Sequence, residues 1–259
     1  MTPPVPARPL LLLDYDGTLA PLVADPAAAL PHPDVPALLA ALAARGPLYV
    51  LTGRDLGTLA TLLTGPDGAP VPVAAVGLHG AEEGLLGQTA MRPAYERHAA
   101  ALRDARARVP QRPGVRVEAK GGDAFAVHYR GASDVAAVEA ALEAWTREAP
   151  DALEAVWGKC VVELRPRGVS KGAAARRLAA AHPEWTPVCL GDDVTDEHAF
   201  EALADVPGAV TIRVGPGATA ARHRLPDVEA AVAYLRRVLE TSADAPVGAS
   251  EPDAHARIG

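Results

Sequence analysis

The sequence predicts an α/β fold: a doubly wound, Rossmann-like parallel sheet with a smaller α+β domain inserted into it. Short and almost wholly apolar runs alternate with helical segments at both ends of the chain, which is typical of a parallel sheet covered on both faces. Between residues 93 and 167 the order changes to helix–strand–strand, and this unit occurs twice. The chain has 259 residues, 49% of them hydrophobic, which is enough to bury a core in both parts.

The first part of the chain, residues 1–92, predicts strands that alternate with helices. Its apolar runs are short enough for strands, and the segments between them space their apolar residues as helices do. Gly46 supplies a helix stop, because glycine adopts the left-handed conformation that often ends a helix. We expect, in order, a strand at 10–15, a helix at 34–45, a strand at 48–51, a helix near 55–63 and a strand at 73–77.

The middle of the chain, residues 93–167, predicts the α+β lid domain. Gly121 and Gly122 mark a turn between two alternating strands, and Ser133 is a good N-cap for the helix that follows them. Gly158 marks a second turn. We expect a helix at 93–108, strands at 115–119 and 124–129, a helix at 133–148, and strands at 153–156 and 160–164.

The last part, residues 168–240, predicts a return to the core sheet. Ser170 is suited to cap its first helix. We expect a helix at 170–181, a strand at 188–191, a helix at 196–204, a strand at 209–214 and an amphipathic helix at 227–239. Residues 241–259 are rich in Ser, Ala, Asp and Pro and are predicted to be disordered. Residues 1–92 and 168–240 would therefore form one catalytic core, with 93–167 as its lid.

The composition limits the possible binding partners and the cellular location of the protein. The net charge is −7 and no long Lys/Arg block occurs, which argues against a nucleic-acid or anionic-membrane surface. No apolar stretch is long enough to span a bilayer, and the Pro-rich start lacks the apolar region of a signal peptide. Cys160 and Cys189 lie in apolar strand-like runs and are expected to be buried free thiols. We expect a cytoplasmic monomer with a small-molecule substrate and neither a nucleic-acid nor a membrane partner.

The apolar run at residues 10–13 ends in two aspartates, Asp14 and Asp16. Residues i and i+2 of a strand point to the same face, so the two carboxylates would meet. Their repulsion must then be relieved by a metal, a proton or a basic partner. The alternative is a simple turn, because Asp-Gly-Thr is common in turns.

Polar residues also follow the other predicted strands. Thr52 and Arg54 follow one strand, His79 another and Asp192 a third. Ligands of open α/β sheets bind beyond the carboxyl ends of the strands, so these residues are expected to converge with the aspartates on one crevice.

An acidic cluster runs from Asp192 through Asp193 to Asp196. Carboxylate oxygens suit Mg²⁺, and with Asp14 across the crevice they predict a magnesium site. The alternative is a helix N-terminus whose acidic residues are stabilised by the helix dipole.

Cations and backbone amides complete a possible anion site. Lys171 follows the N-cap Ser170, so its amide and its ammonium can face the same anion. Thr52 offers a hydroxyl, Gly53 an unobstructed amide and Arg54 a guanidinium. Such residues predict a phosphate site, although ordinary surface charge is the alternative for each one alone.

Four motifs follow one another along the chain: Asp14, Asp16, Gly17 and Thr18; then Thr52; then Lys171; and then Gly191-Asp192-Asp193. Together they resemble the motifs of the haloacid dehalogenase-like phosphatase superfamily, across most of the chain. The resemblance implies that Asp14 is the nucleophile and that Asp16 is the general acid and base. Thr52 and Lys171 would bind the phosphoryl group. Mg²⁺ would be held by Asp14, the backbone carbonyl of Asp16 and Asp192, with Asp193 and Asp196 as further ligands or orienting groups.

Longer stretches resemble one family within it, the trehalose-6-phosphate phosphatases. They are residues 52–54, 77–82, Lys120-Gly121-Gly122, 128–130, 161–166, 168–172 and 191–197. The resemblance implies a C2-type cap and Mg²⁺-dependent hydrolysis of trehalose 6-phosphate through an aspartyl-phosphate. It also implies sugar contacts from Lys159 and Glu163 and substrate-phosphate positioning by four core residues, Gly53, Arg54, His79 and Gly80.

Some positions leave alternatives open. Leu78 stands where some relatives have Glu, which puts one expected substrate contact in doubt. Lys159 and Glu163, like Glu118 and Lys120, could instead be ion pairs on an exposed sheet face. The alternative functions are a phosphatase of another sugar phosphate (sucrose 6-phosphate or mannosyl-3-phosphoglycerate), a phosphomutase, or a sugar-phosphate-binding regulator.

Overall fold

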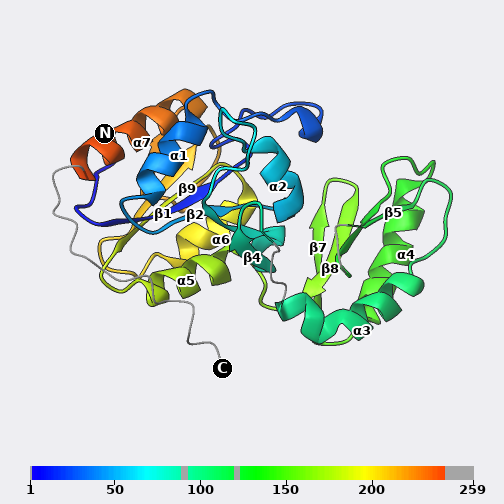
Figure 1. The fold of residues 1–259 in the computed structure, drawn as a ribbon. Coiled ribbons are helices and arrows are strands. Elements are labelled where there is room, and N and C mark those ends of the chain that lie inside the picture. Colours follow the sequence, from blue (N-terminus) through cyan, green and yellow to red (C-terminus); the bar gives the residue numbers. More distant parts are fainter. Residues whose placement is uncertain (1, 89–92, 120–122, 243–259) are drawn as a thin grey trace.

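Strand β1 (Pro9–Asp14) lies inside a seven-stranded sheet and carries the first aspartate at its carboxyl end. The structure is a computed structural model that describes residues 2–88, 93–119 and 123–242 (Figure 1). The predicted turn at Gly121 and Gly122 and the motif residue Lys120 lie outside the described residues. So do residues 243–259 of the segment predicted to be disordered, 241–259; its first two residues end α7 (Val228–Ser242) instead.

The large sheet has the strand order β11-β10-β9-β1-β2-β3-β4, and every pair in it is parallel except β3 with β4. Since β1 is flanked by β2 on one side and β9 on the other, the strand order reverses beside it, which is where α/β sheets place their ligands. Its other strands are β2 (Leu48–Leu51), β3 (Ala74–Gly77), β4 (Glu82–Leu85), β9 (Thr186–Gly191), β10 (Val210–Val214) and β11 (His223–Leu225).

Helices cover both faces of this sheet, as a doubly wound fold requires (Figure 1). Alternate residues of β1 point to opposite faces: Leu11 and Leu13 join one hydrophobic cluster, and Leu10 and Leu12 join another. The first cluster is closed by α1 (Val35–Ala43), α2 (Leu56–Leu62) and α7 (Val228–Ser242), and the second by α5 (Lys171–Ala181) and α6 (Val194–Ala202).

A second, four-stranded antiparallel sheet stands beside the first, in the strand order β5-β6-β8-β7 (Figure 1). Its helices and sheet share a separate hydrophobic cluster, which includes Leu102, Leu142 and Trp145 from the helices. One face of this small sheet therefore packs on helices, and the other carries polar residues. The elements are α3 (Pro93–Ala107), β5 (Arg116–Ala119), β6 (Phe125–His128), α4 (Val135–Arg147), β7 (Leu153–Gly158) and β8 (Val161–Pro166).

The structure differs from the sequence prediction at several points. β4 and β11 were not predicted: both are short and polar, and both lie at an edge of the sheet. α4 is capped by Asp134, whose side chain accepts a hydrogen bond from Ala137 N, and Ser133 precedes that cap. α6 begins at Val194, two residues before the predicted start, because Asp193 rather than a later residue caps it.

The two cysteines are both free, as predicted, but their surroundings differ. Cys189 is buried in β9, where burial raises the pKa of its thiol well above the usual value. Cys160 is only half-buried and lies in the turn between β7 and β8 with a φ of +58°, so its predicted strand position was wrong. Among the described residues, none of the helices combines the length and apolar character needed to cross a bilayer.

Candidate active site

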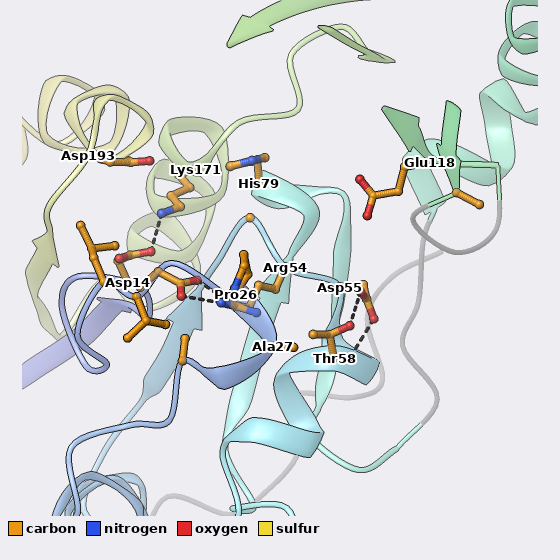
Figure 2. Close-up of a pocket in the computed structure, with 16 residues that line it drawn as sticks. Asp14, Pro26, Ala27, Arg54, Asp55, Thr58, His79, Glu118, Lys171 and Asp193 are labelled. Carbon is orange, nitrogen blue, oxygen red and sulfur yellow. Dashed lines mark hydrogen bonds and ion pairs between the residues drawn. The ribbon is translucent and has the colours of Figure 1, made fainter. Parts of the chain in front are cut away.

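Asp14 and Lys171 form the buried centre of the site (Figure 2). Asp14 ends β1 and is 4% exposed; Lys171 opens α5 and is 3% exposed. Lys171 Nζ donates to Asp14 Oδ1 at 2.6 Å and to Asp196 Oδ1 at 2.8 Å. A buried ammonium between two carboxylates is stable because each charge has a partner, and removing one would leave an uncompensated ion in the interior.

The acidic cluster is fixed by its own hydrogen bonds. Asp196 Oδ2 accepts from the backbone amides of Asp192 and Asp193 at 3.0 and 3.1 Å. Asp193 in turn caps α6 by accepting from the amides of Thr195 and Asp196. Asp193 and Asp196 therefore form the capping box of α6, and their part in an ion site stays a prediction.

The donor set fits a hard cation. Asp14, Asp192 and Asp196 each offer an oxygen within 4.8 Å of the others. Asp14 Oδ2 is buried and has no hydrogen-bond partner in the part of the chain that the structure describes. Both oxygens of Asp196 already accept hydrogen bonds, so Asp14 Oδ2 and Asp192 are the groups left to face an ion. Carboxylate oxygens of this kind suit Mg²⁺.

The carboxylates of this cluster crowd one another electrostatically. Burial raises the pKa of Asp14 to about 7, although Lys171 opposes the shift. Burial and the neighbouring Asp196 and Asp193 raise the pKa of Asp192 to about 6. Burial acts in the same direction on Asp193, but Lys171 and hydrogen bonds from Thr195 and Asp196 outweigh it and lower that pKa to about 2. A divalent ion between Asp14 and Asp192 would relieve the crowding.

Glycines make the close approaches in this centre possible. Gly17 has a φ of +81°, and a Cβ there would lie 2.2 Å from Asp192 Oδ2. A Cβ on Gly191 would lie 2.2 Å from Asp196 Cγ. The two loops that bring Asp14 and Asp192 together therefore depend on residues without side chains.

Arg54 binds Asp16 through both carboxylate oxygens. Arg54 Nε is 2.7 Å from Oδ2 and Nη2 is 2.7 Å from Oδ1. The hydrogen bond to Asp16 is the main reason that the pKa of Arg54 is raised, with burial opposing it. Such a bidentate pair is strong and geometrically defined, and it leaves Asp16 without a free oxygen.

The loop after β2 is joined to the turn after β3 by backbone hydrogen bonds. His79 N donates to Thr52 O at 3.0 Å, and Leu78 N donates to Arg54 O at 2.9 Å. The two loops touch so closely that a Cβ on Gly53 would lie 2.5 Å from His79 Cε1. Gly80, with a φ of +118°, lies against Ser170, which caps α5. The predicted phosphate-binding residues are therefore neighbours in space.

A cavity of about 700 Å³ opens above these residues. It extends from the buried centre to the small sheet, where Glu118 and Ala119 of β5 contribute (Figure 2). Of the predicted site residues, those that line it are Asp14, Asp16, Gly53, Arg54, His79, Lys171 and Asp193. Those absent from its lining are Thr52, Gly80, Lys159, Glu163, Asp192 and Asp196.

The two predicted sugar contacts lie apart from that lining. Lys159 is exposed in the turn between β7 and β8, not on the strand shared with Glu163. Glu163 pairs with Ala126 of β6, which pairs in turn with Glu118, so Glu163 and Glu118 occupy one face of the small sheet. Neither position decides whether they bind a sugar, and both assignments stay predictions.

Sequence reasoning missed several lining residues. Glu118 was considered only as half of a surface ion pair, but it contacts His128, with Oε2 and Nε2 2.6 Å apart. Asp55 and Thr58 line the cavity from α2, and their only sequence signal is that they follow Arg54. The remaining missed residues are Ala119 of β5 and five residues of the segment after β1: Leu22, Val23, Pro26, Ala27 and Ala29.

Comparisons with known proteins agree with this geometry. Residues 12–225 match the sequence model of the trehalose-phosphatase family. The chain belongs to the trehalose-phosphatase family. This trehalose-phosphatase family member is 34% identical to the trehalose-6-phosphate phosphatase of Escherichia coli over 92% of this chain and 89% of that one. It is 36% identical to the trehalose-phosphate phosphatase of Mycobacterium marinum over 84% of this chain, but spans only 58% of that relative.

Solved structures give the same result. The crystal structure of a trehalose-6-phosphate phosphatase related protein superposes with a TM-score of 0.69 at 28% identity, over 90% of this chain and 98% of that one. A phosphatase of the haloalkanoate (HAD) superfamily from Bacteroides thetaiotaomicron has a TM-score of 0.54 at 17% identity, over 90% of this chain and 95% of that one. The latter likeness concerns the fold alone. The predicted fold class and the phosphatase class are confirmed.

Proposed function

We propose that this enzyme hydrolyses trehalose 6-phosphate to trehalose and phosphate, with Mg²⁺ as its cofactor. One observation carries the proposal: the free Oδ2 of Asp14 lies beside Asp192, while Lys171 and Arg54 present cations to the same cavity. An anionic phosphate can approach a carboxylate only where cations offset the repulsion. The names of the most similar relatives support trehalose 6-phosphate as the substrate.

The reaction proceeds in two displacements at phosphorus. A carboxylate oxygen of Asp14 forms a bond to phosphorus as the bond to the sugar oxygen breaks, and the leaving alkoxide takes a proton from Asp16. A water molecule then gives its proton to Asp16 and attacks phosphorus, which releases phosphate and restores the Asp14 carboxylate. Covalent catalysis divides one difficult displacement into two easier ones.

The charged residues around the cavity support these steps. Lys171 holds Asp14 in position and neutralises the anion. Thr52, whose hydroxyl accepts from the Arg54 amide at 3.1 Å, is proposed as a further phosphoryl-binding residue. Mg²⁺ held by Asp14, Asp192 and the backbone carbonyl of Asp16 would further neutralise the phosphoryl oxygens. Asp196 keeps Asp192 and Lys171 in place through the hydrogen bonds described above, and Asp193 accepts from the amide of Asp196.

Each oxygen of Asp16 accepts one hydrogen bond from Arg54, and we propose that this pair opens during turnover so that Asp16 can transfer a proton. The substrate phosphate is a competing partner for the guanidinium, since Arg binds phosphate in the same bidentate way. Binding of the phosphate would therefore release the general acid at the moment when it is needed.

The small α+β unit, residues 93–167, is proposed to act as a C2-type cap on a core formed by 1–92 and 168–240. The support is that Glu118 and Ala119 line the same cavity as Asp14 and Lys171. Closure of the cap would exclude water and place polar groups on the sugar. Glu163 shares the face of Glu118 and remains a candidate sugar contact, as does Lys159 from the turn.

A panel assay tests the substrate. Phosphate release would be measured for trehalose 6-phosphate, sucrose 6-phosphate, mannosyl-3-phosphoglycerate and p-nitrophenyl phosphate, with Mg²⁺ and with EDTA. We expect the highest kcat/KM for trehalose 6-phosphate and no release with EDTA. A higher value for either of the other two sugar phosphates would overturn the substrate. The cytoplasmic location and the monomeric state stay predictions from the sequence.

A further inference from the structure

The basic side chains among the described lining residues lie at one end of the cavity. Lys171 and Arg54 lie at the buried end beside Asp14, Asp16 and Asp193, and the phosphate is proposed to bind there. The outer end carries carboxylates, Asp55 of the core and Glu118 of the small sheet (Figure 2). An outer end of this kind repels a second anion and favours an uncharged ligand with hydroxyl donors, because a carboxylate is an acceptor only.

Asp55 has little capacity left for such a ligand. Its Oδ1 accepts from Thr58 N at 2.8 Å and its Oδ2 accepts from Thr58 Oγ1 at 2.7 Å. Glu118 differs: Oε2 is 2.6 Å from His128 Nε2, and no hydrogen bond from a described residue reaches its other oxygen. Glu118 is therefore the carboxylate at this end with an oxygen available.

The contact between His128 and Glu118 crosses two strands on the open face of the small sheet. His128 pairs with Arg116 and Glu118 pairs with Ala126, so the two side chains are diagonal neighbours on one face. Glu118 is 42% exposed, and a glutamate with that exposure and no partner would sample many rotamers. The imidazole of His128 restricts the Glu118 carboxylate, because the His128 side chain has few rotatable bonds and its backbone is fixed in β6.

We propose that His128 is a positioning residue for substrate: it holds the Glu118 carboxylate so that the free oxygen faces the hydroxyls of the sugar. The inference rests on the proposed function, because it needs a sugar phosphate whose phosphate lies at Lys171. His128 does not touch the reacting atoms. His128 lowers the entropic cost of sugar binding, because the Glu118 carboxylate that accepts from the sugar hydroxyls is already fixed before the sugar binds.

A purely structural role would look different. Cross-strand pairs stabilise sheets, so loss of the contact could weaken the whole cap and affect every substrate alike. Positioning instead affects only substrates that reach Glu118. p-Nitrophenyl phosphate has no sugar, and it therefore reports on the phosphate end alone.

The experiment compares His128→Phe, His128→Gln and Tyr129→Phe by KM and kcat on trehalose 6-phosphate and on p-nitrophenyl phosphate. Phe keeps a ring of similar size but removes the donor, and Gln restores a donor near the position of Nε2. Tyr129 is the matched control, because its hydroxyl donates to Glu139 Oε1 at 2.7 Å, away from the cavity lining.

We expect His128→Phe to raise KM for trehalose 6-phosphate about tenfold, as loss of a hydrogen bond to a charged group does, with kcat little changed. The ratio of kcat/KM between the two substrates should fall by the same factor. His128→Gln should recover most of this loss, and Tyr129→Phe should leave the ratio unchanged. Adding His128→Phe to Glu118→Ala should have no further effect on KM.

Equal losses of His128→Phe on both substrates, an unchanged KM, or no recovery in His128→Gln would each overturn the proposal. The wild-type enzyme separates this failure from that of the proposed function. If it prefers another sugar phosphate, the function is wrong and the same ratio is measured with that substrate. If it hydrolyses p-nitrophenyl phosphate but no sugar phosphate, both fail.

Discussion

Arg54 donates to both carboxylate oxygens of Asp16, each at 2.7 Å, and both residues line the cavity that contains Asp14. The proposed general acid is therefore held by the residue proposed to meet the substrate phosphate. Under the proposed function, phosphate binding and release of the acid would be one event, because the guanidinium would exchange one bidentate partner for another. This relationship links substrate binding to proton transfer without a separate switch.

Arg54→Ala should lower kcat/KM for trehalose 6-phosphate by roughly 10²–10³, the cost of losing one charged donor in an active site. The guanidinium is lost as a phosphate partner, although Asp16 becomes free. Steady-state kinetics measure the effect, with Arg147→Ala as control because Arg147 pairs with the nearby Glu143 on the exposed side of α4. A change within about threefold of wild type would remove Arg54 from phosphate binding.

Lys171→Met should destabilise the fold as well as abolish activity. It leaves Asp14 and Asp196 buried without their shared cation, which costs about 3–5 kcal/mol of unfolding free energy. Urea denaturation measures the loss. Arg147→Ala removes an exposed ion pair and should cost less than about 1 kcal/mol. If the two variants were equally stable, Lys171 would not be the counter-ion of the buried carboxylates.

Gly17→Ala should weaken the binding of Mg²⁺, because the new Cβ would lie 2.2 Å from Asp192 Oδ2 and displace that carboxylate. The Mg²⁺ concentration for half-maximal activity should rise about tenfold or more. Gly68→Ala is the matched control: its φ of +77° imposes the same backbone strain, and nothing lies within 4 Å of its Cβ. An equal effect of both variants would attribute the loss to backbone strain instead.

Mg²⁺ should stabilise the wild-type enzyme against heat, and EDTA should remove that gain. An ion that binds only the folded state contributes about 2.7 kcal/mol at a hundred times its Kd. Asp192→Asn should lose most of this gain, whereas Asp205→Asn, whose carboxylate pairs with Arg176 on the surface, should keep it. Thermal melts with and without Mg²⁺ decide the matter. A gain that persists in Asp192→Asn would place the ion elsewhere.

The core of the site could be predicted because it depends on chain topology. Apolar runs reveal buried parallel strands, and polar residues just after them must meet at one edge of the sheet. Asp14, Lys171 and Asp192 converge there as expected. The sequence could not say how Asp196 divides its two oxygens between Lys171 and the backbone, since that depends on the cap geometry of α6.

The outer end of the site was harder to predict because it depends on two domains at once. Glu118 contributes to the cavity only through the placement of the small sheet beside the core. Lys159 was considered to share an exposed sheet face with Glu163, but Lys159 lies in the turn between β7 and β8, beside Cys160 with its positive φ. The edge strand β4 escaped prediction since Glu82 and Glu83 lack the apolar pattern of the central strands.

The central claim is that Asp14 attacks phosphorus. Acid quenching during turnover of trehalose 6-phosphate that carries radiolabelled phosphate tests it directly, with the label bound to protein measured in wild type, Asp14→Asn and Asp16→Asn. We predict transient labelling in wild type and none in Asp14→Asn. Asp16→Asn lacks the acid for the first displacement as well as the base for the second, so it should become labelled more slowly than wild type. Label that appears in Asp14→Asn, or substrate hydrolysis by that variant at the wild-type rate, would contradict the account.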